Sequence, residues 1–254
     1  MKLGCTQSNM DPTLFYMKDE KGQLHGLIAS HIDDFLHAGD SMFESCVLDK
    51  LRHRFIAGKI AEGIFTYIGF QLHQTEKGIL IDQNRYVDRI QVDKLEPQRT
   101  TQKQDNLNSQ ELTQLRKLAG TLNWVVQGCR PDMVFELVDI STKFKCGTVA
   151  DLIRAVKAVR YVKDGRCQIY FPNMGSSDFW QIVVFTDAAL ANLSDGISSM
   201  RAYIIFLIGQ NGLCCPIAWN GNKIKRVVRS TIAAEALSLQ EVLEEALYLH
   251  QMLV

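Results

Sequence analysis

The sequence predicts an α/β fold of the α+β kind, in which strands and helices are largely grouped in separate parts of the chain. Alternating apolar and polar residues, which are typical of strands, occur in residues 12–40 and again in residues 180–225. Between these parts, residues 111–165 contain three runs with apolar residues at helical spacing. The 254 residues are 46% hydrophobic, so the chain is long enough for one large domain or two ordinary ones.

The first strands surround a pair of aspartates. Residues 12–40 predict three strands, with a Lys-Gly turn after the first strand and Asp33-Asp34 at the tip before the third. Residues 41–55 predict a helix, since Ser41 and Glu44 occupy capping-box positions. Its apolar residues at helical spacing are Phe43, Val47, Leu48, Leu51 and Phe55.

The next two segments predict a hairpin and a boundary. Residues 65–83 predict a hairpin that turns at 76–78, and residues 85–95 predict a short helix. The segment from Pro97 to Gln110 is polar and lacks periodicity, so it predicts an exposed connection between subdomains.

The second half begins with helices and ends with a sheet. Three helices are expected at residues 111–127, 130–144 and 149–165. Three antiparallel strands are expected after Trp180, followed by a long helix from Ser230 to the end of the chain. The predicted organisation is therefore residues 1–96, 97–179 and 180–254.

Composition narrows the classes of partner. The formal net charge is zero, so electrostatic recruitment of nucleic acid must come from local clusters of Lys and Arg. No signal-peptide core and no run of eighteen apolar residues is present, which predicts a soluble intracellular protein, cytoplasmic or nuclear, with no membrane partner. The seven cysteines form no C-x-x-C pair, so free thiols are expected rather than a zinc site.

Asp33 and Asp34 form the first candidate site. Strand alternation would place Asp33 on the face of His31 and Asp34 on the face of Ile32, so only one of the two is expected to be buried in a site. Carboxylates about 4 Å apart repel by roughly 4 kcal/mol at an effective dielectric of 20, which makes a divalent metal their natural partner. The alternative is a tight turn, in which Asp is common.

Asp187 and Glu235 form the second candidate site. Asp187 shares a strand face with two apolar residues, Val183 and Phe185, which would normally disfavour a charge. The alternative explanation for Asp187 is a strand-end cap. Glu235 is expected to begin a buried stripe of the last helix, which continues through Leu239, Val242, Ala246, Leu249 and Leu253. Glu241, Glu244 and Glu245 lie off this stripe and are expected on the surface. A strand carboxylate facing a helix carboxylate would suit oxygen-ligated Mg²⁺.

Two basic clusters are candidate nucleic-acid contacts. One helix places four basic residues three apart, and a second cluster leads into the helix of Glu235. Solvated surface charge is the alternative explanation for both. The candidate residues are Arg154, Lys157, Arg160 and Lys163, then Lys223, Lys225, Arg226 and Arg229.

The motifs resemble, in order and over nearly the whole chain, the Pol polyprotein of copia-type long-terminal-repeat retrotransposons. "HIDDFLHAG" is similar to the Asp-Asp motif of the family's reverse transcriptase, and "YIGFQL" and "GILIDQNRYVDRI" to the segments that follow it. "LRKLAGTLNWVVQGCRPDM" is similar to its Leu-x-Gly-x-Leu and Arg-Pro-Asp blocks. "VFTDAALANL" and "STIAAEALS" resemble the first two carboxylate motifs of its ribonuclease H.

The resemblance implies a role for each part of the chain. Residues 1–96 would be part of a reverse transcriptase palm, 97–179 a helical thumb or connection, and 180–254 part of a ribonuclease H-like domain. The family activities are RNA-directed DNA synthesis and cleavage of RNA in RNA–DNA hybrids, with Mg²⁺ as cofactor. By this resemblance Asp33, Asp187 and Glu235 are metal ligands, and Asp34 is a less direct neighbour of the polymerase metal.

The chain also departs from the family pattern. His31 replaces the usual aromatic residue, the palm's other catalytic aspartate would precede Met1, and the remaining ribonuclease H carboxylates would follow Val254. Both active sites are therefore expected to be incomplete, with weak or absent Mg²⁺ binding.

Three hypotheses follow from these departures. The leading one is an inactive fragment of the polyprotein, whose partners are nucleic acid, including RNA–DNA hybrid, and the missing halves of the polyprotein. The second is a host-retained, non-enzymatic module that binds nucleic acid or another protein. The third is a truncated gene model.

Overall fold

The computed structural model describes residues 4–55, 60–93 and 95–253. It combines helices with antiparallel sheets, which confirms the α+β class. The contacts divide the chain into two compact units: residues 1–68 with 247–254, and residues 69–246. The predicted boundaries at residues 96 and 179 stay a prediction.

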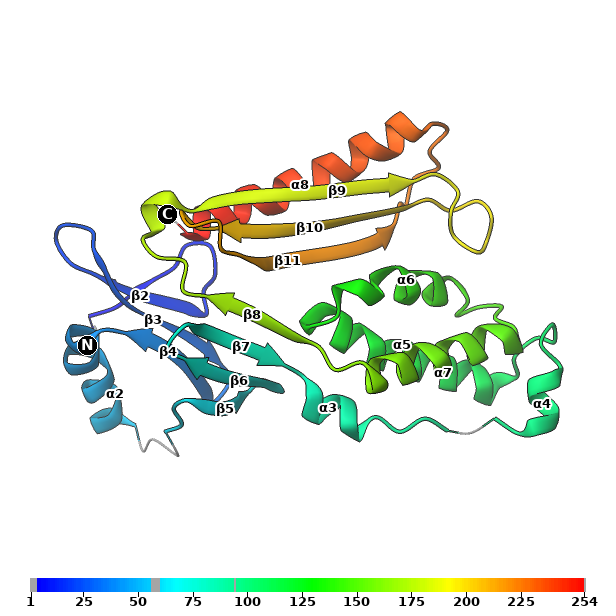
Figure 1. Ribbon diagram of the computed structural model, residues 1–254, viewed down its shortest axis with the longest axis horizontal. Coiled ribbons are helices and arrows are strands. Elements are labelled where there is room, and N and C mark those ends of the chain that lie inside the picture. The colour runs from blue at the N-terminus through cyan, green and yellow to red at the C-terminus, as the bar shows by residue number, and fades with distance from the viewer. Residues whose placement is uncertain (1–3, 56–59, 94, 254) are drawn as a thin grey trace. The chain divides into compact units, whose positions relative to one another are not determined.

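The first unit is built on an antiparallel sheet with strands in sequence order (Figure 1). Its hairpins agree with the three strands expected around Lys21-Gly22 and Asp33-Asp34. A helical segment follows, in which one π-helical stretch separates two short α-helices. The elements are β1 (Thr6–Gln7), β2 (Leu14–Lys18), β3 (Leu24–His31), β4 (Asp34–Gly39), α1 (Ser41–Phe43), η1 (Glu44–Leu48), α2 (Asp49–Arg54) and β5 (Ile64–Tyr67).

Phe43 anchors this helical segment to the sheet. Its side chain is fully buried, and a Cβ atom added to Gly26 or Gly39 would lie 2.2 or 2.3 Å from its ring. The two glycines therefore leave the space on β3 and β4 that the ring fills. The buried residues around it are Ile28, Val47 and Leu48.

The cap of this helical segment differs from the expectation. Asp40, not Ser41, is the N-cap, and its side chain accepts a hydrogen bond from the Phe43 backbone N–H at 3.0 Å. The expected Ser41–Glu44 capping box is wrong, since Glu44 instead accepts a hydrogen bond from Arg52 at 2.5 Å.

The second unit contains a small sheet and a helical core. The hairpin of β6 and β7 turns at Glu76-Lys77, as expected, and β8 pairs with the other side of β7. The strand β8 was not expected, because it is short and pairs with residues far away in the sequence. The strands are β6 (Phe70–Thr75), β7 (Gly78–Asp82) and β8 (Gln168–Pro172), and the helices are α3 (Asn84–Arg89), α4 (Pro97–Thr101), α5 (Ser109–Gly128), α6 (Val134–Thr142) and α7 (Val149–Asp164).

Helices α5 and α7 begin at complete capping boxes. In α5, Asn108 caps the helix and Glu111 bonds back to the Asn108 backbone N–H. In α7, Thr148 and Asp151 make the same reciprocal pair. Each box satisfies backbone N–H groups that have no partner within the helix. Leu115, Leu122 and other apolar residues of these helices then pack into one continuous core.

The last sheet has helices on both faces (Figure 1). Its strands are β9 (Gln181–Ala189), β10 (Met200–Ile208) and β11 (Cys214–Lys223), with β10 in the centre, and α8 (Thr231–Leu253) follows them. On one face, the Thr186 hydroxyl lies 2.6 Å from that of Ser238 on α8. On the other face, the Trp219 indole N–H donates to the Val126 carbonyl of α5 at 2.7 Å.

An ion network around the buried carboxylate of Asp139 joins α6, α7 and the loop between β9 and β10. Arg154 of α7 donates two hydrogen bonds of 2.6 Å to Glu136 and a third to Asp139, both on α6. Asp139 also accepts from the backbone N–H of Ser194 at 2.7 Å. Burial disfavours the charged form of Asp139, but the bonds from Ser194 and Arg154 outweigh it and hold its pKa below the usual value.

We expect Asp139→Asn to lower the free energy of unfolding of the second unit by about 2 kcal/mol, because a neutral amide replaces the buried charged acceptor of the hydrogen bonds from Arg154 and Ser194. All three tryptophans lie within residues 69–246, so urea unfolding followed by tryptophan fluorescence measures this unit. Asp164→Asn, at an exposed position of α7, is the control and should change stability by less than about 0.5 kcal/mol. Equal effects of the two substitutions would contradict the role of the network.

His25 and Asp40 join β3 to the start of α1. The His25 ring is 10% exposed, with its Nδ1 atom 2.7 Å from the Asp40 carboxylate and its Nε2 atom 3.8 Å from that of Asp19. The hydrogen bond to Asp40 is the main cause that raises the pKa of His25 above 6.5. The same bond is the main cause that lowers the pKa of Asp40.

The His25–Asp40 pair should stabilise the first unit most between about pH 4 and 6.5. The His25 contribution is complete below its unfolded pKa and is lost as the pH rises through the higher folded value. The Asp40 contribution is present above its unfolded pKa and is lost as the pH falls through the lower folded value. Asp40→Asn keeps a capping side chain and removes the charge. Urea unfolding by circular dichroism should therefore show the largest difference from wild type inside that window, whereas His37→Gln should show none.

Candidate metal and nucleic-acid sites

Asp33 lies in the turn of the hairpin formed by β3 and β4. His31 is paired with Asp34, so Ile32 and Asp33 are the two turn residues. The expected position at a hairpin tip is confirmed. The expected alternation of Asp33 and Asp34 between two strand faces is wrong, because the chain turns between His31 and Asp34 instead of continuing as a strand. Both aspartates are exposed, so neither is buried in a site.

Ile32 makes this turn with an unusual backbone conformation. Its φ angle is +53°, in the left-handed region that β-branched residues rarely adopt, and its side chain is 84% exposed. Nearby, burial raises the pKa of Tyr67 on β5, and the Asp34 carboxylate adds to this shift. The hairpin tip therefore exposes two carboxylates, of which that of Asp34 influences Tyr67.

Asp187 lies on the face of the last sheet that α8 does not cover. Its neighbours Thr186 and Ala188 contact Ser238 and the apolar cluster of Ala234 on α8, so alternation directs Asp187 to the opposite face. Its carboxylate is exposed and accepts a hydrogen bond from the adjacent Ala188 N–H at 3.0 Å.

Glu235 is not the first residue of a buried stripe. The buried residues of α8 are Ala234, Ser238 and Val242, whereas Glu235 and Leu239 are exposed. The face that packs on the sheet is therefore offset from the expected stripe, because small residues allow α8 to approach β9 closely. The expectation that the Asp187 and Glu235 carboxylates face each other is not met.

Glu241 does not lie on the solvated surface, contrary to the expectation from the sequence. It forms an ion pair with Arg201 of β10 and accepts a hydrogen bond from Asn222 of β11 at 3.1 Å. Burial raises the pKa of Tyr203 to about 12, with Glu245 and Glu241 adding to the shift. The signal that could have placed Glu241 correctly is the spacing of Ala234 and Ser238, which puts it on the same helix face.

These acids do not fit a magnesium centre by themselves. Within residues 4–55, 60–93 and 95–253, no three His, Cys, Asp or Glu side chains converge on a possible metal position. Two-metal phosphoryl chemistry needs several carboxylates around ions about 3.5–4 Å apart. Asp33, Asp34, Asp187 and Glu235 are all exposed and supply no such group.

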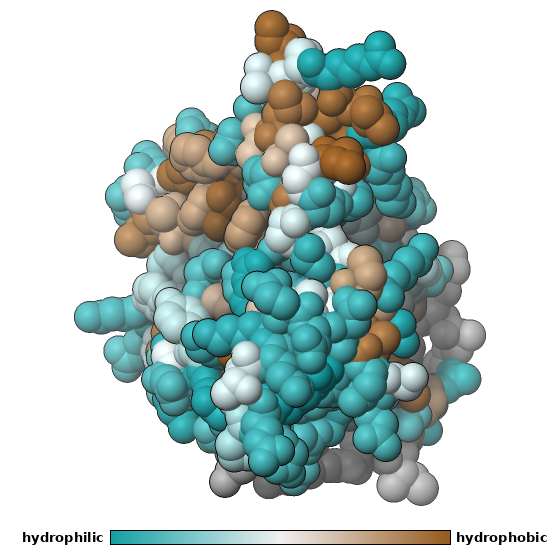
Figure 2. Space-filling model, turned by 90° about the vertical axis from the view of Figure 1, so that its right-hand side faces the viewer, coloured by the Kyte–Doolittle hydropathy of each residue, from teal (hydrophilic) through white to brown (hydrophobic). Residues whose placement is uncertain are grey.

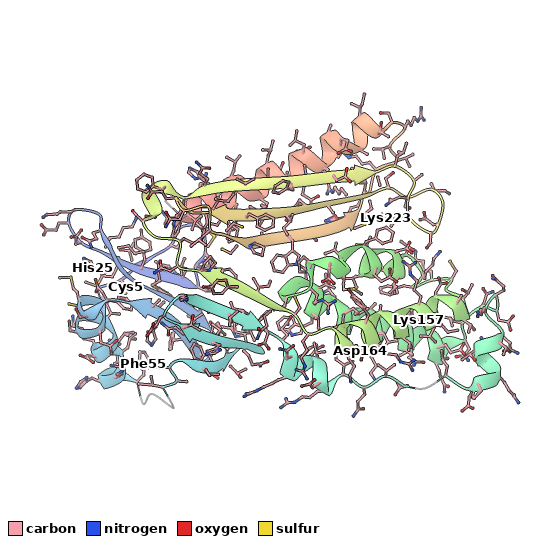
Figure 3. All side chains as sticks on the ribbon, in the orientation of Figure 1. Cys5, His25, Phe55, Lys157, Asp164 and Lys223 are labelled. Atoms are coloured by element: carbon pink, nitrogen blue, oxygen red, sulfur yellow. The ribbon has the colours of Figure 1, made fainter. Side chains whose placement is uncertain are left out.

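The first basic cluster is only partly available to a ligand. Arg154 belongs to the ion network with Glu136 and Asp139, and Lys163 donates a hydrogen bond to the Ile90 carbonyl at 2.7 Å. Lys157, labelled in Figure 3, and Arg160 are exposed. Neither has a hydrogen-bond or ion-pair partner in the part of the chain that the structure describes. The exposed basic face of α7 therefore consists of Lys157 and Arg160.

The second basic cluster lies between β11 and α8. Lys223 pairs with Asp195 at 3.2 Å. Lys225, Arg226 and Arg229 are exposed, with no such partner among the described residues. Three unpaired cations within five residues provide the denser candidate contact for phosphate.

Comparison with known proteins finds two Pol polyproteins that are similar to the chain. No protein-family model matches the chain. It is 25% identical over 251 residues to the retrovirus-related Pol polyprotein from transposon RE2 of Arabidopsis thaliana, and 26% identical over 251 residues to that from transposon RE1 of the same plant. Each alignment covers 94% of this chain. The chain is a relative of copia-type retrotransposon Pol polyproteins.

The family expectation from the sequence motifs is thereby confirmed. The chain spans only 16% of the length of these Pol relatives. Among its described residues, no helix is both long and apolar enough to cross a membrane.

We expect Ile32→Gly to raise the free energy of unfolding of the first unit by about 1 kcal/mol, since glycine adopts a positive φ angle without the steric cost. Ile64→Gly is the matched control. Ile64 is also β-branched and 66% exposed, but it lies in β5 and is not among the residues with positive φ. The control should lower stability, and thermal unfolding measures both variants. A loss of stability in Ile32→Gly would contradict strain at the turn.

Proposed function

We propose that this chain is a Pol segment that contains part of a reverse transcriptase palm, a helical connection and part of a ribonuclease H-like domain. The observation that carries the proposal is the alignment with Pol polyproteins over 94% of the chain. The position of Asp33 at a hairpin turn and of Asp187 on a strand of an antiparallel sheet supports it. The activities proposed for the whole polyprotein are RNA-directed DNA synthesis and cleavage of RNA–DNA hybrids.

We propose a narrower activity for the chain by itself: electrostatic binding of nucleic acid without catalysis. The exposed cations Lys157, Arg160, Lys225, Arg226 and Arg229 support contacts to a phosphate backbone. The lack of a cluster of three possible ligands among the described residues supports the absence of a working magnesium centre. RNA–DNA hybrid is the proposed ligand, and other parts of the polyprotein are the proposed protein partners.

A non-enzymatic module retained for nucleic-acid binding is the alternative function. The same free cations favour it, because they need no metal to bind phosphate. Binding alone does not separate the two proposals. An activity assay with the rest of the polyprotein added distinguishes them. A Pol segment should then take part in Mg²⁺-dependent synthesis or cleavage, whereas a retained module should not.

The pure chain should bind a labelled RNA–DNA hybrid weakly, with affinity falling as salt rises, and should show no nucleotide incorporation or hybrid cleavage with Mg²⁺. The triple variant Lys225→Gln, Arg226→Gln, Arg229→Gln should weaken binding and reduce the salt slope by about 3, one unit for each lost phosphate contact. Fluorescence anisotropy at several salt concentrations measures both quantities.

The control variant is Lys21→Gln with Lys50→Gln, which removes exposed charges from elsewhere in the chain. It should leave the affinity and the salt slope nearly unchanged. Binding that is insensitive to salt would contradict the electrostatic contact, and Mg²⁺-dependent activity of the pure chain would contradict the absence of a magnesium centre.

A further inference from the structure

Gln83, between β7 and α3, carries a buried polar atom that the protein does not pair. Figure 2 shows many hydrophilic residues on one face of the molecule, where solvent can pair with their polar atoms. Gln83 is different because it is only 2% exposed. Its Oε1 atom is buried and has no hydrogen-bond partner within the described residues. Because a buried acceptor without a donor is destabilising, this oxygen requires a partner.

The Gln83 amide is held against the last turn of α5. Its Nε2 atom donates a hydrogen bond to the Trp124 carbonyl at 3.3 Å, which decides which end of the amide is the acceptor. A Cβ atom added to Gly128, the last residue of α5, would lie 2.1 Å from Oε1. The missing side chain of Gly128 therefore leaves the space in which Oε1 lies.

A small cavity lies beside this amide. Gln83 lines it together with Val125 and Cys129, which come from the same end of α5. The cavity gives the centre of a water-sized sphere a volume of about 10 Å³. This space suits one water molecule and excludes a larger ligand.

The chemistry of the lining favours a neutral ligand that can donate a hydrogen bond. Arg130 also lines the cavity, but its guanidinium already donates two hydrogen bonds to Asp132 and one to the Gly165 carbonyl. Among the described residues that line the cavity, none is Asp or Glu, so a cation would lack a counter-charge there. Asn84 and Cys167 supply further polar groups to the lining.

We propose that this cavity binds one long-lived water molecule, which donates a hydrogen bond to Oε1 of Gln83. Buried waters of this kind pair polar groups that the protein itself leaves unpaired. The water connects the junction of β7 and α3 to the end of α5 and to the segment before β8, because residues of all three segments line the cavity. The proposal does not depend on nucleic-acid binding.

Magnetic relaxation dispersion of oxygen-17 in water tests the site, because it counts waters that stay bound for longer than the protein takes to tumble. Gln83→Met keeps a side chain of similar length and removes Oε1, so this variant should hold one long-lived water fewer than the wild type. Gln74→Met makes the same change at an exposed position of β6 and should lose none. An unchanged count in Gln83→Met, or an equal loss in both variants, overturns the proposal.

Gly128→Ala tests the site without changing Gln83. Its new methyl group would lie 2.1 Å from Oε1 and must displace the amide, so the same water should be lost. Gly120→Ala, in the same helix, is the matched control, because a Cβ atom there meets nothing within 4 Å. Retention of the water in Gly128→Ala overturns the role of Oε1, and circular dichroism shows whether each variant keeps its fold.

The wild-type chain provides a test that needs no substitution. A rotating-frame Overhauser effect between water and the side-chain amide protons of Gln83 is expected, with the sign that distinguishes it from proton exchange. Its absence overturns the proposal even if a variant fails to fold.

Discussion

The ion network of Asp139 and Arg154 is the interaction on which the second unit depends. Asp139, on α6, accepts hydrogen bonds from the Arg154 side chain of α7 and from the backbone N–H of Ser194 in the loop after β9. One buried carboxylate therefore connects two helices to the sheet. Leu193, within this loop, and Met200, the first residue of β10, belong to the same apolar core as the helices. Since a buried charge is stable only when it is fully paired, the spacing of these elements is narrowly constrained.

The same network gives the four basic residues of α7 different roles. Arg154, Lys157, Arg160 and Lys163 recur every third residue and look equivalent in the sequence. The fold uses Arg154 and Lys163 for internal contacts and leaves Lys157 and Arg160 in solvent. A periodic charge pattern therefore predicted which helix face is basic, but not which of its charges are free.

The last sheet and α8 meet through small residues, and this contact decides where the acids lie. Ala234 and Ser238 let α8 approach β9, which turns Glu241 toward Arg201 and leaves Glu235 in solvent. The larger apolar residues Leu239 and Leu243 are then left about half exposed. Their exposure and the separation of Asp187 from Glu235 follow from one helix rotation.

By itself, the sequence determined the local elements: the hairpin tip at Asp33-Asp34, the turn at Glu76-Lys77, the main helices and the last three strands. It did so because turn residues, capping residues and apolar spacing act over a few neighbouring positions. The sequence also indicated the family, because its motifs occur in the same order as in copia-type Pol polyproteins. Only the tertiary structure decided the partner of β8, the rotation of α8, the internal use of Arg154 and the exposure of the candidate carboxylates. These depend on contacts between segments far apart in the chain, where close packing and the pairing of buried charge select one arrangement among several that the local pattern allows.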